Sequence, residues 1–212
     1  MNLAGRVARA ALLAGGALGL AACAGSLLGR RAPPVAYELS AHAGARGPRI
    51  AADLKVLTPL VRAGLDTDRI AASYPDRRLD HFSGARWSAP LDETIEQLAV
   101  QEFRARSALR NVVPEASALH TRYWLEIEVV AFQARYPAGG GAPTIEAHFV
   151  ARLGDVRGGT TLARIDARVA RPAAANRMTA IVAAFEAAAD RALDRIVAAT
   201  DRRLAGRAGA PL

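Results

Sequence analysis

The sequence predicts an α/β (α+β) fold, in which two main helices pack on a mixed, mostly antiparallel sheet within a single domain. Three stretches between residues 123 and 169 alternate apolar and polar residues, which is typical of strands with one buried and one wet face. Two other stretches, 91–106 and 178–203, repeat apolar residues at helical spacing. Residues 48–203 form the predicted domain, and this length is enough for one hydrophobic core.

Residues 1–22 predict a signal peptide. Arg6 and Arg9 are the only charged residues in this stretch, and residues 10–22 are Ala, Leu and Gly. This uncharged core is too short to span a bilayer, which needs about 20 residues, but it suits an export signal. Its removal leaves 190 of the 212 residues and lowers the net charge from +8 to +6.

The signal peptide ends in a lipobox formed by Leu20, Ala21, Ala22 and Cys23. Small residues before the cysteine let the signal peptidase close around an extended backbone. Cys23 is the only cysteine, so it has no disulfide partner within an exported chain, whereas a thioether-linked lipid would remove the free thiol. The alternative is an ordinary signal peptide that ends in Ala-x-Ala.

We therefore predict covalent diacylglycerol and N-acyl lipid on Cys23, with no separate cofactor and no metal. Each buried methylene contributes about 0.8 kcal/mol, so three acyl chains would hold the protein in its membrane. Ala24 and Gly25 follow the cysteine in place of the Asp that retains enterobacterial lipoproteins in the inner membrane. The expected location is the cell envelope, facing the periplasm, with the outer membrane favoured over the inner.

Residues 23–47 predict the lipidated cysteine followed by a flexible tether, which is rich in Ala, Gly, Arg and Pro. Within it, residues 35–39 could pair as a short edge strand. The domain then begins with a strand at 54–59 that stops at a proline. A polar turn at 64–68 leads into strands 69–73 and 78–82, which are expected to form a hairpin ending at Trp87.

A helix is expected over residues 91–106, with Ser88 as its cap and Pro90 in its first turn. Acidic residues near its start and arginines near its end complement the helix dipole. A short strand at 111–113 follows. The three clearest strands are 123–134, 145–153 and 163–169, joined by loops at Gly139–Gly141 and Gly158–Gly159; the second main helix follows, and residues 204–212 are expected to fray.

The residues show no catalytic pattern. The four histidines lie far apart in sequence, and no nucleophile elbow, phosphate loop or dinucleotide fingerprint occurs. Glu126 and Glu128 point the same way from one strand and could pair as carboxylates, but a solvated strand face is the simpler interpretation. Arginines are interleaved with acids along the chain, so nucleic acid is excluded as a partner. The sequence predicts no enzyme.

Several sequence motifs occur in order within residues 35–200: Val56-Leu57-Thr58-Pro59, Gly64-Leu65-Asp66-Thr67-Asp68-Arg69-Ile70, Leu79 to Leu91, Tyr123-Trp124-Leu125-Glu126-Ile127, Ala151 to Asp155 and Ala183 to Ala188. Together they resemble the ABC-type transport auxiliary lipoprotein family, which contains the paraquat-inducible lipoprotein. Phe82 stands where family members often have tyrosine. The resemblance implies work with an ABC transporter and a mammalian-cell-entry protein that move lipids between the two membranes of Gram-negative bacteria.

Three functions compete. In the first, the protein docks the periplasmic part of the transporter, and the residues expected to contact it lie in 64–87: Leu65, Asp66, Arg69, Arg86 and Trp87. The alternative for Trp87 is packing beneath the first helix. In the second, the protein carries lipid in a cavity lined by Phe149, Phe185 and Ile181, whereas a solid core would favour docking. The third is an unrelated outer-membrane assembly lipoprotein. Under each of the three functions, the protein could also form homo-oligomers.

Overall fold

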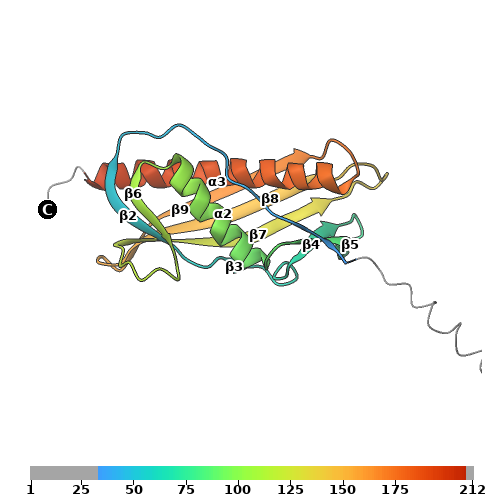
Figure 1. Cartoon of the computed structure of the whole chain (residues 1–212), viewed down its shortest axis with the longest axis horizontal. Helices are drawn as coiled ribbons and strands as arrows, with labels where there is room; N and C mark the ends of the chain where they lie inside the picture. The colour runs from blue at the N-terminus through green and yellow to red at the C-terminus, as the bar shows by residue number, and fades with distance from the viewer. Residues whose placement is uncertain (1–32, 209–212) are drawn as a thin grey trace, which may run out of the picture. The chain divides into compact units, whose positions relative to one another are not determined.

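The computed structural model describes residues 33–208. The signal peptide, the lipobox and Cys23 lie outside the described residues. Figure 1 shows the arrangement of the elements, with α3 extending along the long axis and β2 and β6 at the opposite end from β4 and β5. In chain order the elements are β1 (Val35–Tyr37), β2 (Ile50–Val56), β3 (Leu60–Val61), β4 (Arg69–Ser73), β5 (Leu79–Trp87), α2 (Leu91–Arg106), β6 (Leu109–Pro114), β7 (Tyr123–Arg135), β8 (Thr144–Asp155), β9 (Thr160–Pro172) and α3 (Met178–Ala208).

Within the described residues, the strands form one mixed nine-stranded sheet centred on β7. One edge of β7 pairs antiparallel with β8, which pairs antiparallel with β9 over its full length. The other edge of β7 pairs in turn with β2, β3 and β4, all parallel but only two or three residues long. The two longest ladders, β7–β8 and β8–β9, are therefore antiparallel, and the predicted fold class, a mostly antiparallel mixed sheet with two helices, is confirmed.

The strands predicted at 69–73 and 123–169 form as expected, but β7 contains an irregularity that the alternation does not reveal. The register between β7 and β8 shifts between Val129 and Ala131. Leu125, Ile127 and Val129 are buried before the shift, and Phe132 and Ala134 are buried after it. Strict alternation over residues 123–134 would place Ala131 on the core face with Val129, but Ala131 is only half-buried, because the β-bulge at this point moves the buried face onto the even-numbered residues.

Helix α2 has the predicted bounds, but the prediction for its cap is wrong. Pro90, rather than Ser88, occupies the N-cap position, and no side chain caps the helix. The Thr94 hydroxyl in the first turn instead donates to the carbonyl of Ala89 at 3.1 Å. Asp92 and Glu93 lie in the first turn and Arg104 and Arg106 in the last, in favourable orientation to the helix dipole.

Residues 33–47 do not form the predicted tether, because the described part of this segment packs on the domain. Strand β1 pairs with β5, and Leu39 is buried. The backbone amide of Ser40 donates to Glu186 at 3.1 Å, and that of His42 donates to Glu102 at the same distance. The folded unit accordingly starts at Pro34 instead of residue 48.

Helix α3 continues beyond the point where fraying was expected. It extends to Ala208, and Leu204 in its last two turns is fully buried in the core. Burying a leucine side chain contributes roughly 1.5–3 kcal/mol, which keeps these turns in place. The predicted start of the C-terminal tail at residue 204 is therefore wrong.

Candidate functional site

Two of the residues predicted to contact a partner belong to the core. Only 1% of Trp87 and 3% of Leu65 is exposed. The Trp87 ring packs edge-on against Phe185, with 5.3 Å between ring centroids, and lies 5.8 Å from Phe132. Neither side chain can reach a partner, and the alternative interpretation of Trp87 as a packing residue is the correct one.

The other three predicted contact residues lie at the surface of the same segment. Asp66 and Arg69 are exposed, and Arg86 is partly exposed. The Arg86 guanidinium donates to the Asp68 carboxylate at 3.2 Å. This ion pair links the two ends of the β4–β5 hairpin. No feature of these residues selects one kind of partner.

The space between the sheet and α3 is filled by aromatic rings. The centroid of Phe132 lies 4.8 Å from that of Phe185 and 5.8 Å from that of Phe149. The residues predicted to line a lipid cavity are Phe149, Phe185 and Ile181. All three are buried in one continuous hydrophobic cluster. Surface pockets of about 270 to 590 Å³ on the described residues are lined by other side chains. The interior is therefore filled by side chains at the position of the predicted lipid cavity.

The face of the sheet opposite this core carries paired charges. Arg152 donates to Glu126 across β7 and β8, and His148 lies 3.1 Å from Asp166 across β8 and β9. Such cross-strand pairs stabilise sheets by roughly 0.2–1 kcal/mol each. Since Glu126 is engaged by Arg152, it does not form a free carboxylate pair with Glu128.

At the start of β7, this face bears an aromatic platform that the sequence did not single out. The indole of Trp124 lies flat over Gly154, its antiparallel neighbour on β8. A Cβ atom at Gly154 would lie 2.0 Å from Cε2 of Trp124, so only glycine admits the ring there. The Trp124 platform comprises Trp124 and the other residues that line a surface pocket of about 410 Å³: Lys55, Leu57, His120, Thr121, Glu126 and Val156.

The Trp124 platform combines apolar surface with a firm support. Val156, on its rim, is 62% exposed, and nearby in sequence Leu119 is 43% exposed. Beside it, Asp155 is held by Arg122, whose Nη2 donates to Oδ2 at 2.9 Å. The Arg122 hydrogen bond lowers the pKa of Asp155 below its ordinary value of 3.8. Trp124 is partly exposed, and tryptophan is enriched among the residues that contribute most to protein-binding surfaces.

A second group of polar residues lies between α2 and α3. Arg106 contacts three carboxylates, at 2.9 Å from Glu102 and 3.2 Å from Asp194, and it also contacts Asp190. Glu102 is fully buried, and this burial raises the pKa of its carboxyl. His42, Glu102 and Asp190 offer ligand atoms within 4.8 Å of one another. The amide of His42 donates to Glu102 and its carbonyl accepts from Arg106, so the group links the N-terminal segment to α2 and α3.

The structure defines an α+β domain with a filled core beneath α3 and a partly exposed tryptophan on the opposite face of an open sheet. A match to a known family identifies the domain more closely. Residues 37–197 match the ABC-type transport auxiliary lipoprotein component family, and the chain belongs to that family. The family is one of transport components and is not a known enzyme family. The resemblance noted in the sequence is thereby confirmed.

Solved structures share the fold. A DUF330-family protein of Xanthomonas campestris is 24% identical, with a TM-score of 0.71 over 82% of this chain and 97% of that chain. A hypothetical protein of Chlamydia trachomatis is 11% identical, with a TM-score of 0.53 over 74% of this chain and 99% of that one. No curated protein matches this sequence. Of the helices among residues 33–208, none has the length and apolar character needed to cross a bilayer.

Proposed function

We propose that the protein is a periplasmic lipoprotein, anchored through a lipid on Cys23, that docks the periplasmic part of an ABC/mammalian-cell-entry transporter. The transporter would move lipids between the inner and outer membranes. Family membership over residues 37–197 supports the link to an ABC transporter. The lipobox at Leu20–Ala21–Ala22–Cys23 supports the anchor, and Ala24 and Gly25 favour the outer membrane.

The solid core is the observation that favours docking over carrying lipid. A drug-sized or acyl ligand needs a pocket that buries most of its surface. Phe132, Phe149 and Phe185 occupy the position where such a pocket was expected, with ring centroids 4.8 to 5.8 Å apart. A protein that cannot enclose the lipid can still contribute to transport by holding the component that does.

The Trp124 platform is the docking surface we propose, in place of the segment 64–87. Trp124 and Tyr136 lie at opposite ends of β7, about 40 Å apart at 3.3 Å per residue. Tyr136 lies beside the end of β4 and the tip of the β4–β5 hairpin, since Ser73 pairs with both Arg135 and Leu79. The platform lies at the other end of β7 from Tyr136 and the β4–β5 hairpin tip, on the solvent-facing side of the sheet, where a periplasmic partner can reach it.

Site-specific photo-crosslinking tests this assignment. A photoreactive phenylalanine replaces Val156 on the platform rim, and the matched control replaces Arg164, which is exposed on β9. The proposal expects crosslinks from position 156 to a mammalian-cell-entry protein and far fewer from position 164. Equal yields at both positions would reject the platform, and crosslinks only to outer-membrane assembly factors would favour the unrelated assembly lipoprotein.

A further inference from the structure

The loop that joins β7 to β8 carries no charge. Residues 136–143 read Tyr-Pro-Ala-Gly-Gly-Gly-Ala-Pro, and residues 137–142 are all exposed. The loop at the other end of β8, residues 156–159, contains Arg157 and follows the buried carboxylate of Asp155. An exposed loop that offers only apolar side chains and backbone suits the boundary between water and lipid better than bulk water does.

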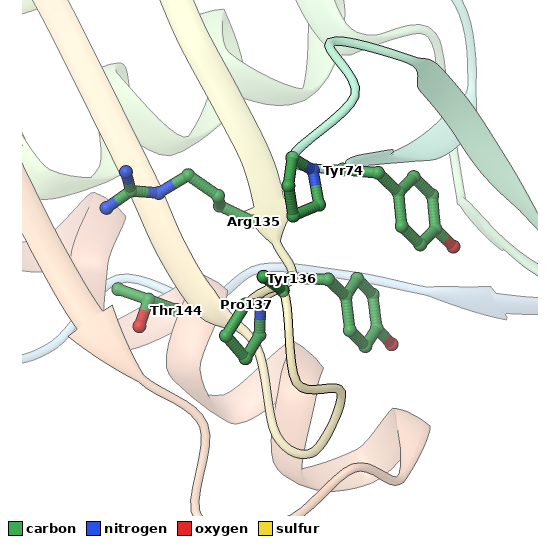
Figure 2. A pocket seen from close by; sticks show the side chains of 7 residues that line it. Tyr74, Arg135, Tyr136, Pro137 and Thr144 are labelled. Carbon is green, nitrogen blue, oxygen red and sulfur yellow. The ribbon is translucent and has the colours of Figure 1, made fainter.

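Aromatic side chains flank this uncharged loop. Tyr136 stacks on Tyr74 of the β4–β5 hairpin, with ring centroids 5.3 Å apart and planes 7° from parallel. Figure 2 shows the two rings side by side, with their hydroxyls directed the same way. Phe82 lies 6.5 Å from Tyr136, and Leu79 of the same hairpin is 40% exposed. Tyrosine is enriched at the headgroup level of membranes, because its ring is apolar and its hydroxyl is polar.

This end of the sheet is also basic. Five arginines lie around the loop and the hairpin tip, against the three acidic residues Asp76, Asp80 and Glu146; the arginines are Arg77, Arg78, Arg135, Arg171 and Arg177. Asp76 pairs with Arg78 at 3.8 Å, and Glu146 pairs with Arg135 at 3.1 Å. Arg77, Arg171 and Arg177 are exposed to solvent, where they would favour anionic headgroups.

The chain between Cys23 and strand β1 is long enough to reach this end of the sheet. Strand β1 runs parallel to β5, with Val35 opposite Ala85 and Tyr37 opposite Trp87. Leu79, at the hairpin tip, lies six residues from Ala85 along β5, which is about 20 Å at 3.3 Å per residue. Eleven residues separate Cys23 from Val35, and they include Arg30 and Arg31 but no acid. Fully extended, they span at most about 40 Å.

We infer that this end of the domain rests on the phospholipid leaflet that holds the lipid on Cys23, an inference that depends on the proposed anchor. Loop 136–143 and the stacked tyrosines lie at headgroup level, and the arginines contact anionic headgroups. The membrane-resting end comprises loop 136–143, the hairpin tip 74–79 and these arginines. This orientation directs the Trp124 platform away from the membrane, toward the periplasmic partner.

Hydrogen exchange on the lipidated full-length protein tests the inference. The protein is reconstituted in vesicles of phosphatidylethanolamine and phosphatidylglycerol and compared with the Cys23→Ser chain free in solution. Backbone amides of 74–79 and 138–142 are expected to exchange about tenfold more slowly on the vesicles, while those of 156–161 keep their rate. Equal rates in both states at 74–79 and 138–142 would overturn the inference.

Two matched substitutions separate membrane contact from tethering. Ala138→Asp places a carboxylate in the uncharged loop, and Val156→Asp places one at another exposed position, at the other end of the sheet. Ala138→Asp is expected to abolish the slower amide exchange on vesicles, and Val156→Asp is expected to leave it unchanged. In the Cys23→Ser chain, Arg77→Ala should weaken vesicle binding about fivefold. The inference is wrong if Ala138→Asp shows the same slower exchange on vesicles as the unchanged protein and Arg77→Ala binds vesicles as tightly as the Cys23→Ser chain without it.

The mass of the N-terminal peptide reports the anchor independently. A peptide that starts at Cys23 with three acyl chains supports the proposed anchor, and an unmodified cysteine rejects it. In the second case, the chain that starts at Cys23 is coupled through its single thiol to a maleimide lipid, and the exchange experiment is repeated. Failure of the anchor and failure of the membrane-resting end are therefore distinguishable.

Discussion

Phe185→Ala tests whether the interior is as solid as the docking function requires. The Phe185 ring is fully buried on α3 and contacts two other rings, Trp87 at 5.3 Å and Phe132 at 4.8 Å between centroids. Replacing a buried phenylalanine by alanine costs about 3–5 kcal/mol, which includes the cavity left behind. The two aromatic contacts, worth about 0.5–1.5 kcal/mol each, place the expected loss in the upper half of that range.

Urea unfolding followed by tryptophan fluorescence measures this loss, because Trp87 touches the altered site. For a domain of this size, a loss of about 4 kcal/mol lowers Tm by about 8–16 °C. Leu60→Ala, at a residue that is 52% exposed, is the control and should change stability by less than about 0.5 kcal/mol. If Phe185→Ala does not fold, Phe185→Leu replaces it, with an expected loss of about 1–2 kcal/mol.

A small loss at Phe185 would refute the reasoning. If Phe185→Ala costs less than about 1 kcal/mol, the ring borders an existing space in place of a packed core. Stabilisation of the unchanged protein by added dodecanoate would support the same conclusion, because a ligand that binds the folded state raises its stability. Either result would move the lipid carrier ahead of docking.

Two further predictions concern the face that carries the Trp124 platform. Gly154→Val should displace the Trp124 indole, because a Cβ there lies 2.0 Å from the ring. We expect the free energy of unfolding to fall by about 1–3 kcal/mol and acrylamide to quench the tryptophan fluorescence more strongly. Combining Gly154→Val with Trp124→Ala should add little further loss of stability. Asp155 has a lowered pKa because Arg122 donates to its carboxylate, so its stabilising contribution exists above pH 3.8 and disappears as the pH falls through the folded-state pKa. Asp155→Asn should therefore be less stable than the unchanged protein at pH 7 but lose less on acidification, as measured by urea midpoints; parallel pH profiles would contradict this.

The elements whose periodicity is local were predictable from sequence. Helix α2 occupies the expected residues 91–106, and β4 the expected 69–73, because each carries its pattern within one stretch of chain. The bulge at Val130 was not predictable. Residues 129–132 are all apolar, so the sequence gives no indication of where the alternation changes phase.

Features that depend on distant contacts escaped prediction. The segment before β2 looked like a tether, because the groups that hold it, Glu102 and Glu186, lie 60 and 146 residues further along the chain. The Trp124 platform depends on a register that places Gly154 opposite Trp124. Conversely, Trp87 looked like a contact residue because its burial against Phe185 cannot be read from its own strand.

The most direct test of the docking function is mass spectrometry of the proteins that co-purify with the lipidated protein from gently solubilised, crosslinked cells. The unchanged protein is compared with Trp124→Ala and with Arg164→Ala as the matched surface control. We expect an ABC ATPase, its permease and a mammalian-cell-entry protein to be enriched with the unchanged and Arg164→Ala proteins and depleted with Trp124→Ala. Absence of all three from the unchanged protein would contradict the docking function.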